Sequence, residues 1–335
     1  MIDKNIFRDK KALITGGLGF IGSNLALRLV EYGAQVTLVD SLIPEYGGNL
    51  FNIDPIRDQV RINFSDVRDE HSMKYLVQNK DYLFNLAGQT SHLDSMNDPY
   101  TDLEINAKAQ LFILEACRWN NPAIKIIFAS TRQLYGRPQY LPVDEKHPLF
   151  PVDVNGINKM AGEWYHLVYN NVYGIRSAVL RLTNTYGPRM RVKDARQTFL
   201  GIWIRRLIEG DPILVFGDGL QLRDFNYVDD VIDALLITAA SDRANGEIFN
   251  LGADDPVSLK DTAEQMVRVY GRGSYEIVPF PEERKIIDIG DYYGNYDKIM
   301  DIFQWRPKTS LADGLSTTLE FYERFSQYYW GPDNG

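Results

Sequence analysis

The sequence has little cysteine, no long apolar run and a deficit of positive charge, and each shortage excludes a class of protein. One cysteine, Cys117, cannot form a disulfide within the chain, so we expect a reducing, cytoplasmic setting. The longest apolar stretch, at 234–240, is far shorter than the roughly 20 residues that cross a bilayer, and the first residues lack the layout of a signal peptide. The net charge of -9 argues against sequence-independent binding of nucleic acid.

What is present is the composition of an ordinary globular protein. Hydrophobic residues make up 44% of the 335 residues and charged residues 24%. We find no repeat of 20–50 residues, which excludes a solenoid. We also expect no metal site. A chain of this length is more than one core usually holds, so we expect two domains.

The first half alternates between short apolar runs and helical patterns. The expected strands are 11–15, 35–40, 60–64, 82–87, 125–129 and 177–182, and the main expected helices are 20–32, 102–119 and 158–172. Apolar runs without polar alternation, separated by helices, are typical of a parallel sheet covered on both faces. We therefore predict an α/β fold, a doubly wound parallel sheet of the Rossmann type.

After residue 188 the alternation loosens. Short strands at 213–216 and 276–278 mix with helices at 199–209, 259–270 and 296–303. We predict that 1–188 forms a cofactor-binding Rossmann domain, which also receives segments near 225–255, including a strand at 247–250. Residues 189–335 are expected to form mainly a smaller α/β substrate domain.

Three glycines, Gly16, Gly19 and Gly22, stand between the first strand and the first helix. The first permits a tight turn, the second lets the backbone approach a pyrophosphate, and the third lets helix and sheet pack closely. The helix N-terminus then offers free N–H groups and the positive end of its dipole to phosphate. This context predicts a dinucleotide site, with Phe20 and Ile21 in the same loop.

Two acidic residues follow the next two strands. Asp40 can accept both ribose hydroxyls of adenosine and would repel a 2′-phosphate, and no Lys or Arg follows it at once. NAD is therefore favoured over NADP as the cofactor. Asp66, with its neighbour Val67, is placed to hold the adenine amino group.

Five motifs in order resemble the extended short-chain dehydrogenase/reductase group, and in particular its nucleotide-sugar epimerases and dehydratases. The motifs are Thr15 to Gly22, Asn85 to Gln89, Ser130 to Gly136, Arg181 to Arg189 and Gly217 to Asp230, and the likeness runs from about residue 8 to 325. The resemblance implies tightly held NAD and a nucleoside-diphosphate sugar as substrate. It also implies a homodimer through the helices at 102–119 and 158–172. The further cofactor contacts that it implies are Leu86, Ala87, Gln89 and Lys159.

The family's catalytic set is a Ser or Thr, a Tyr, and a Lys four residues after the Tyr. Thr131 matches the first and Lys159 the third, but the tyrosine position holds Asn155. No tyrosine in the sequence stands four positions before a lysine. An Asn amide forms hydrogen bonds but takes up no proton at neutral pH. Loss of a general base typically costs on the order of 10² to 10⁴ in rate.

Three interpretations remain open for this altered Thr/Asn/Lys set. Another group can serve as acid and base, and His92, just past the fourth strand, is the leading candidate, ahead of Asp153 and Tyr135. The enzyme can instead act on a sugar that is already a ketone. Catalysis can also be lost, which would leave a protein that only binds NAD and a nucleotide sugar.

A second departure bears on the reaction class. Dehydratases of this family carry an Asp-Glu pair after the Thr, whereas Arg132 and Gln133 follow Thr131 here. Neither side chain can shuttle the proton that dehydration requires. The prediction is therefore an NAD-dependent epimerase, with dehydration or decarboxylation less favoured.

The resemblance also places the substrate residues. Asn184 is expected to bind the diphosphate by its amide, Arg223 to neutralise it, and Arg284 to close on it from the C-terminal region. Gln197 and Phe199 fall where the family covers the base, and Phe216 is a candidate to pack on the ribose or base.

Overall fold

One seven-stranded sheet dominates the computed structural model, which describes residues 3–196 and 198–330. Its strands are β1 (Lys11–Thr15), β2 (Gln35–Val39), β3 (Arg61–Asn63), β4 (Tyr82–Asn85), β5 (Lys125–Thr131), β6 (Ser177–Leu182) and β11 (Ile248–Asn250). They run parallel in the order β11-β6-β5-β4-β1-β2-β3. The order reverses between β1 and β4, and such a reversal opens a crevice at the carboxyl ends of the strands. The predicted doubly wound α/β fold is confirmed.

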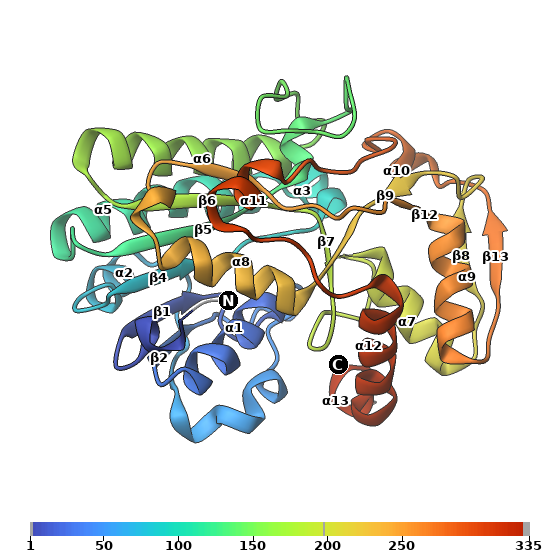
Figure 1. Ribbon diagram of the computed structural model, residues 1–335, viewed down its shortest axis with the longest axis horizontal. Coiled ribbons are helices and arrows are strands. Elements are labelled where there is room, and N and C mark those ends of the chain that lie inside the picture. The colour runs from blue at the N-terminus through green and yellow to red at the C-terminus, as the bar shows by residue number, and fades with distance from the viewer. Residues whose placement is uncertain (1–2, 197, 331–335) are drawn as a thin grey trace.

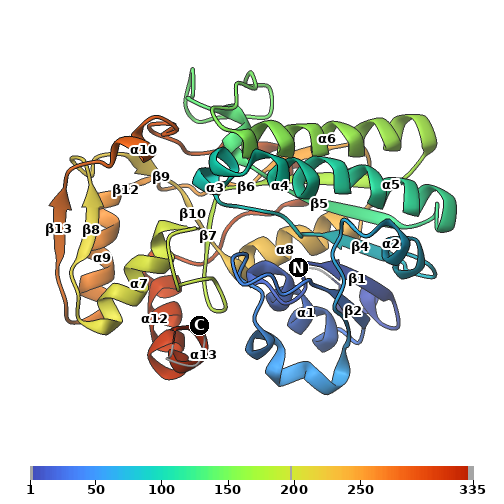
Figure 2. The same ribbon diagram turned by 180° about the vertical axis from the view of Figure 1, so that it is seen from behind.

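Helices cover both faces of this sheet, which explains its unbroken apolar strands. Ala12, Leu13 and Ile14 of β1 are all fully buried. One face carries α1 (Phe20–Glu31), the 3₁₀ segment η2 (Leu50–Gln59) and α8 (Val228–Ala239), and the other carries α2 (Glu70–Leu76), α5 (Ala109–Asn120) and α6 (Val154–Tyr173). Figures 1 and 2 show α1 and α8 along one side of the sheet and α5 and α6 along the other.

The helices near the site differ from the expected ones. The helix expected at 102–119 is divided into α4 (Pro99–Leu103), a π turn η3 (Glu104–Lys108) and α5, and a short helix α3 (His92–Asn97) precedes them. Helix α6 begins at Val154 rather than near 158, because Asp153 caps it: the Asp153 carboxylate accepts a hydrogen bond from the Gly156 N–H at 2.7 Å. Asn155 therefore lies in the first turn of α6.

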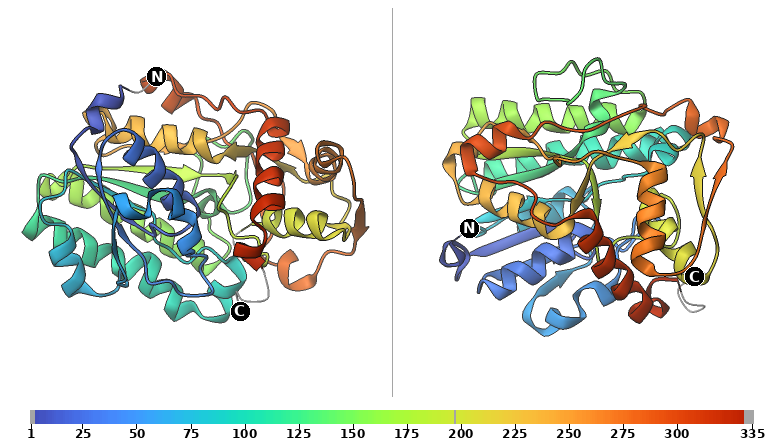
Figure 3. Two further views of the ribbon diagram at one scale, coloured as in Figure 1. Left: turned by 90° about the horizontal axis from the view of Figure 1, so that it is seen from below. Right: turned by 45° about the vertical axis from the view of Figure 1, so that its right-hand side comes forward.

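The C-terminal segments form a smaller unit beside the carboxyl ends of the sheet. It contains α7 (Phe199–Glu209), β8 (Ile213–Phe216), β9 (Leu222–Arg223), β12 (Val257–Ser258), α9 (Leu259–Tyr270), β13 (Tyr275–Val278), α10 (Glu282–Lys285), α12 (Leu311–Phe325) and α13 (Gln327–Trp330). Strands β8 and β13 pair in parallel, and Figure 3 shows them side by side with the orange helix α9, away from the large sheet.

Shorter elements join the two units. Strand β7 (Asn184–Tyr186) pairs with β10 (Phe225–Tyr227), and α11 (Asp297–Phe303) contacts β11. The remaining 3₁₀ turns are η1 (Lys4–Phe7), η4 (Arg132–Tyr135) and η5 (Asp242–Ala244). Segment 225–255 returns to the large sheet through α8 and β11, while the predicted division into domains at residue 188 stays a prediction.

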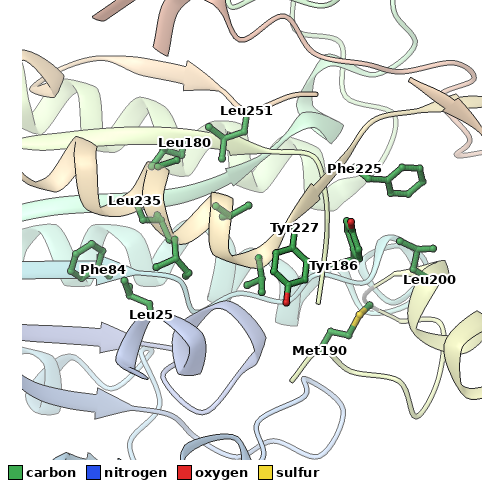
Figure 4. Close-up of a cluster of buried hydrophobic side chains, with 14 of the residues drawn as sticks. Leu25, Phe84, Leu180, Tyr186, Met190, Leu200, Phe225, Tyr227, Leu235 and Leu251 are labelled. Carbon is green, nitrogen blue, oxygen red and sulfur yellow. The ribbon is translucent and has the colours of Figure 1, made fainter. Parts of the chain in front are cut away.

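A continuous hydrophobic core links the sheet to the C-terminal unit. Figure 4 shows Phe84 and Leu180 on the sheet beside Leu235 of α8, and Tyr186 and Met190 continuing toward the C-terminal helices. All five are at most 1% exposed. Because interiors pack at the density of organic crystals, this shared core fixes the two units that flank the strand ends.

A buried ion pair anchors α6 on the sheet. The Arg181 guanidinium on β6 donates to both carboxylate oxygens of Glu163 on α6, with Nη2 to Oε2 at 2.7 Å. Its Nη1 donates to the Tyr135 hydroxyl at 2.6 Å, which in turn donates to the Asn250 side chain on β11. This network holds α6, and Lys159 on it, in a fixed position relative to three elements of the sheet region.

Helix α5 holds the single cysteine. Cys117 is fully buried, and burial raises the pKa of its thiol, so the side chain behaves as a small apolar group. In the described ranges 3–196 and 198–330, no helix is long and apolar enough to cross a membrane. A cytoplasmic location stays a prediction.

Candidate active site

A cleft of about 680 Å³ lies at the carboxyl ends of the strands, where the sheet faces the C-terminal unit. Its lining includes most of the described residues that the sequence predicted for the site, but not the acid and base candidates Asp153 and Tyr135: Gly16, Gly19, Phe20, Ile21, Gly22, Asp40, Asp66, Val67, Leu86, Ala87, Gln89, His92, Thr131, Asn155, Lys159, Asn184, Phe199, Phe216, Arg223 and Arg284. Gln197 lies outside the described residues. No group of three or more His, Cys, Asp or Glu residues that could hold a metal ion occurs within 3–196 and 198–330.

The glycine loop at one end of the cleft has no room for side chains. Gly16 has a φ of +67°, which favours glycine, and a Cβ on Gly22 would lie 2.2 Å from the Gly16 carbonyl oxygen. Gly19 is the N-cap of α1, where no side chain bonds the first turn. The N–H groups of that turn therefore face the cleft end without a side-chain cap, which fits a pyrophosphate.

Asp40 is fixed at the end of β2 beside this loop. Its two carboxylate oxygens accept from the backbone N–H groups of Leu18 at 3.0 Å and Leu42 at 2.9 Å. Burial raises the pKa of the carboxyl, and these two hydrogen bonds oppose the rise. The held orientation suits a carboxylate that accepts hydrogen bonds from ribose.

Asp66 also lines the cleft, but Arg68 engages its carboxylate. Arg68 Nη2 donates to Oδ2 at 2.7 Å, and Nε donates to Oδ1 at 3.0 Å. Burial acts to raise the pKa of Asp66, and the hydrogen bonds from Arg68 outweigh it and lower that pKa. The carboxylate therefore faces a protein guanidinium, and its predicted contact with adenine stays a prediction.

The chain after β4 is positioned by a hydroxyl on β1. Thr15 Oγ1 donates to Asn85 Oδ1 at 2.9 Å and accepts from the N–H groups of Leu86 and Ala87, each at 3.1 Å. This contact sets the backbone of the segment that continues to Gln89 along the cleft.

Lys159 lies buried in the middle of the cleft. Its ammonium donates to the Ala129 carbonyl at 3.2 Å, and a Cβ on Gly88 would stand 2.8 Å from Nζ. Burial lowers the pKa of Lys159 to about 8, although Asp102 and Glu163 act against that fall. The position fits a lysine that reaches a bound nicotinamide ribose.

Asn155 is part of a buried polar cluster around Asp102. Asn155 Nδ2 donates to the Gln89 carbonyl at 2.8 Å and to Asp102 Oδ2 at 3.1 Å. The amides of Asn106 and Asn158 donate to the same carboxylate at 3.0 Å and 2.8 Å. Asp102 is fully buried, so three amides satisfy a charge that would otherwise be costly. The Asn155 amide thus ties α6 to the chain after β4.

His92 contacts a buried carboxylate. Its Nδ1 lies 3.0 Å from Asp153 Oδ2, and the His92 side chain is 36% exposed while that of Asp153 is fully buried. Gln133 Nε2 donates to the same Asp153 oxygen at 2.8 Å. Burial acts to raise the pKa of Asp153, but the contacts with His92, with the Gly156 N–H and with Gln133 lower it. His92 Nδ1 has no hydrogen-bond partner among the described residues, so this contact is one of distance and charge. A partly exposed imidazole beside an ionised carboxylate is an arrangement suited to proton transfer.

Two hydroxyls stand at the end of β5. Thr131 Oγ1 accepts from the Gln133 N–H at 3.2 Å. Ser130 Oγ is buried and has no hydrogen-bond partner among the described residues, although Ser130 lines the cleft. A buried hydroxyl without a partner is rare enough to mark a place for a ligand or water.

Tyr135, the other predicted candidate, lies behind the cleft. It is fully buried and does not belong to the described lining. Burial raises its pKa to about 12, and its hydroxyl is engaged by Arg181 and Asn250. These contacts make it a structural residue of the network that anchors α6.

Arginine side chains gather where the cleft meets the C-terminal unit. Asn184 Nδ2 donates to the Asp224 carbonyl at 2.9 Å, and Asn184 Oδ1 accepts from Arg132 Nη2 at 3.0 Å. Arg223 Nη1 donates to the Leu222 carbonyl at 2.8 Å, and its Nη2 lies 3.6 Å from Asp288 Oδ1. Burial, together with the nearby charge of Arg132, lowers the pKa of Arg223 to about 10.

Aromatic side chains line the far end. The Phe216 ring lies 5.9 Å from that of Phe280, and the Arg284 guanidinium stands 5.7 Å from the Phe216 centroid. Phe199 and Trp203 of α7 complete this wall, with ring centroids 4.8 Å apart. Such a wall suits a nucleobase and ribose.

Two residues of the site carried no recognised signal in the sequence. Asp102 was expected only as the start of a helix, and nothing local indicates that three asparagines meet its carboxylate. Arg132 was noted only because it replaces an acid. Its position directly after Thr131 at a strand end is the feature that could have marked it as a cleft residue.

Comparisons with known proteins agree with this arrangement. A family model described as "NAD dependent epimerase/dehydratase family" matches residues 12–252. A Methanocaldococcus jannaschii protein named "Putative UDP-glucose 4-epimerase" is 33% identical over 313 residues, with 92% of this chain and 97% of that protein covered. A Bacillus cytotoxicus UDP-N-acetyl-alpha-D-glucosaminuronate decarboxylase is 32% identical, with 93% and 98% covered. The Thermotoga maritima UDP-glucose 4-epimerase, solved with UDP-glucose, superposes with a TM-score of 0.87 at 29% identity, with 94% and 99% covered.

Proposed function

Because the chain belongs to the NAD-dependent epimerase/dehydratase family, we propose that it is an epimerase of a nucleoside-diphosphate sugar. Its relatives include UDP-sugar 4-epimerases and also a decarboxylase, so the family alone leaves the reaction open. The contact of His92 with Asp153 in the cleft is the observation that carries the proposal, because it supplies an acid and base where the family's tyrosine is missing.

NAD is the cofactor of this family, and the described residues fit it. The crowded turn formed by Gly16 and Gly22 and the uncapped start of α1 suit the pyrophosphate, and Asp40 suits the adenosine ribose. When bound, NAD supplies the acceptor and donor of the hydride that leaves a sugar carbon and returns to it. Lys159, whose ammonium donates to the Ala129 carbonyl of β5, would hold the nicotinamide ribose.

His92 takes and returns the proton of the reacting sugar hydroxyl in this proposal. The Asp153 carboxylate, 3.0 Å from Nδ1, stabilises the positive charge that the ring gains on proton uptake. Gln133 and the Gly156 N–H hold Asp153 in turn. Thr131 offers a hydroxyl at the end of β5 as a hydrogen-bonding partner for the same sugar oxygen.

Asn155 has a different task, which is to join α6 to the Asp102 cluster. Its amide donors are already bonded to the Gln89 carbonyl and the Asp102 carboxylate, so the residue is integrated in the site. A phenol at this position could not make both donations. This supports a rearranged acid and base rather than an eroded one.

Arg132 and Gln133 favour epimerisation over dehydration. In this cleft Arg132 Nη2 donates to Asn184, and Gln133 Nε2 donates to Asp153. Neither residue transfers a proton at neutral pH. The elimination of water, which needs a separate acid and base beside Thr131, therefore has no group to perform it there.

The purified protein with NAD is incubated with UDP-, dTDP-, CDP- and GDP-sugars in deuterated water, and the sugar protons are followed by NMR. The proposal predicts a new epimer without deuterium at the inverted carbon, because the hydride leaves and returns to the same carbon. Deuterium beside a carbonyl would instead indicate proton abstraction from a keto sugar. Binding of NAD and nucleotide sugar without any turnover would contradict the proposed activity.

The assembly that we propose is a homodimer through α5 and α6. Ile157, Trp164, Val168 and Val172 of α6 are all exposed apolar residues, and their spacing places them on one face of the helix. Trp119 of α5 is exposed as well. A second copy that packs the same face would cover this patch in a symmetric interface.

A further inference from the structure

Arg132 is a half-buried arginine with an unused donor. It opens η4 directly after Thr131 and lines the cleft. Its Nη2 donates to Asn184 Oδ1 at 3.0 Å, while Nη1 is buried without a hydrogen-bond partner among the described residues. The guanidinium plane also stands 5.1 Å from the centroid of the Tyr292 ring.

This cation is not paired with a carboxylate. No carboxylate of the described residues lies within ion-pair distance of Arg132, whereas the buried Arg181 has both oxygens of Glu163 and Arg223 has Asp288 at 3.6 Å. A charge taken out of water without a counterion is costly, so buried arginines are normally paired. The carboxylates of Asp224 and Asp288 act on the Arg132 charge only from beyond ion-pair distance, and none of the described residues bonds its Nη1.

A second cation stands near it. Arg223 lines the same cleft as Arg132, and the charge of Arg132 contributes to the lowered pKa of the Arg223 guanidinium. Asn184 lies against Arg132, and Asp288 is the one carboxylate in ion-pair contact with Arg223 among the described residues. A half-buried and a buried cation that line the same cleft are arranged for an anion from outside the chain.

On this geometry, and resting on the proposed function, we propose that Arg132 binds an anionic oxygen group of the substrate next to the reacting sugar. Two sources share this chemistry: the phosphate that carries the sugar, and a carboxylate on the sugar itself. The place beside Thr131 puts the group near the sugar rather than near the nucleobase, whose wall is formed by Phe216 and Phe280. The unpartnered hydroxyl of Ser130 lies in the same strand end and can join this contact.

The test compares Arg132→Met and Arg132→Lys with the unaltered protein. Arg243→Met is the control, because Arg243 lies in η5, donates to the Ile302 carbonyl and does not line the cleft. NAD-loaded protein is titrated calorimetrically with UDP, UDP-glucose and UDP-glucuronate. Retained NAD binding and an unchanged melting temperature show that each variant folds. Loss of a charged hydrogen bond predicts about a 10- to 100-fold weaker affinity for Arg132→Met, partial recovery for Arg132→Lys, and no change for Arg243→Met.

The ligands separate the two sources. A loss confined to UDP-glucuronate assigns the carboxylate, and an equal loss for UDP-glucose and UDP-glucuronate assigns the phosphate; both support the proposal. Affinities of Arg132→Met within twofold of the unaltered protein for all three ligands would overturn it. Binding without epimerisation would contradict the proposed function and leave this inference standing, while failure to bind any of the three would count against both.

Discussion

Replacing the buried Lys159 by methionine is predicted to stabilise the nucleotide-free protein at neutral pH while abolishing most of its activity. Lys159 is 6% exposed, and burial lowers its pKa from the usual 10.5 to about 8. One pKa unit corresponds to about 1.4 kcal/mol, so the ammonium costs roughly 3 kcal/mol of stability where it stays protonated. The variant also loses the hydrogen bond to the Ala129 carbonyl, worth about 1 kcal/mol. The expected net gain is about 2 kcal/mol.

The sign of the pH dependence follows from the same values. Below pH 8 the lysine is protonated in both the folded and the unfolded chain, and the full cost is present. Between about pH 8 and 10.5 the unfolded chain binds the extra proton, so the stability of the unaltered protein rises with pH. Above this window both states are neutral and the cost is gone.

The assay is urea denaturation of nucleotide-free protein, followed by circular dichroism between pH 7 and 10. The unaltered protein should approach the stability of Lys159→Met as the pH rises, and Lys159→Met should lie above it at pH 7. A variant that is less stable than the unaltered protein at pH 7, or a difference that does not change up to pH 10, would refute the reasoning about this buried ammonium.

Three further predictions concern the frame of the site. Arg181→Met leaves a buried carboxylate unpaired and should cost about 3–5 kcal/mol in urea denaturation; a loss below 1 kcal/mol would contradict the anchoring network. Gly22→Ala should weaken both NAD affinity and stability, because its Cβ would lie 2.2 Å from the Gly16 carbonyl oxygen. In Gly19→Ala the Cβ would lie 3.2 Å from the same oxygen, so this variant should keep its stability and lose only NAD affinity. Titration with NAD and thermal melting would distinguish the two outcomes. Trp164→Glu should convert a dimer to a monomer in analytical ultracentrifugation. The control Ile286→Glu changes an exposed residue of the C-terminal unit and should leave the oligomeric state unchanged. A Trp164→Glu protein that stays dimeric would place the interface elsewhere.

The large sheet could be predicted from the sequence because its strands are buried on both faces. Runs such as 11–15 and 177–182 are apolar without alternation, and their predicted bounds match β1 and β6. The cofactor and substrate residues could be placed at one edge because the carboxyl ends of parallel strands meet there. A glycine triplet, a strand-end acid and a strand-end hydroxyl then fall into one cleft without further information.

What could not be predicted depends on contacts between distant residues. Helix α3, with six residues, is too short to show a helical period. The break at η3 lies in a segment whose apolar pattern continues smoothly from α4 to α5. The approach of Asp102 to Asn155, and of His92 to Asp153, joins positions more than fifty residues apart. No local pattern reports either contact, although the proposed function rests on the second.

The most direct test of the account is the rate of epimerisation by His92→Gln, measured by NMR with the sugar that the unaltered protein converts. The proposal predicts a fall of about 10² to 10⁴ in kcat with NAD affinity retained, a smaller fall for Asp153→Asn, and no change for His71→Gln, which alters an exposed histidine on α2. Turnover by His92→Gln within threefold of the unaltered protein would contradict the assignment of histidine as the acid and base.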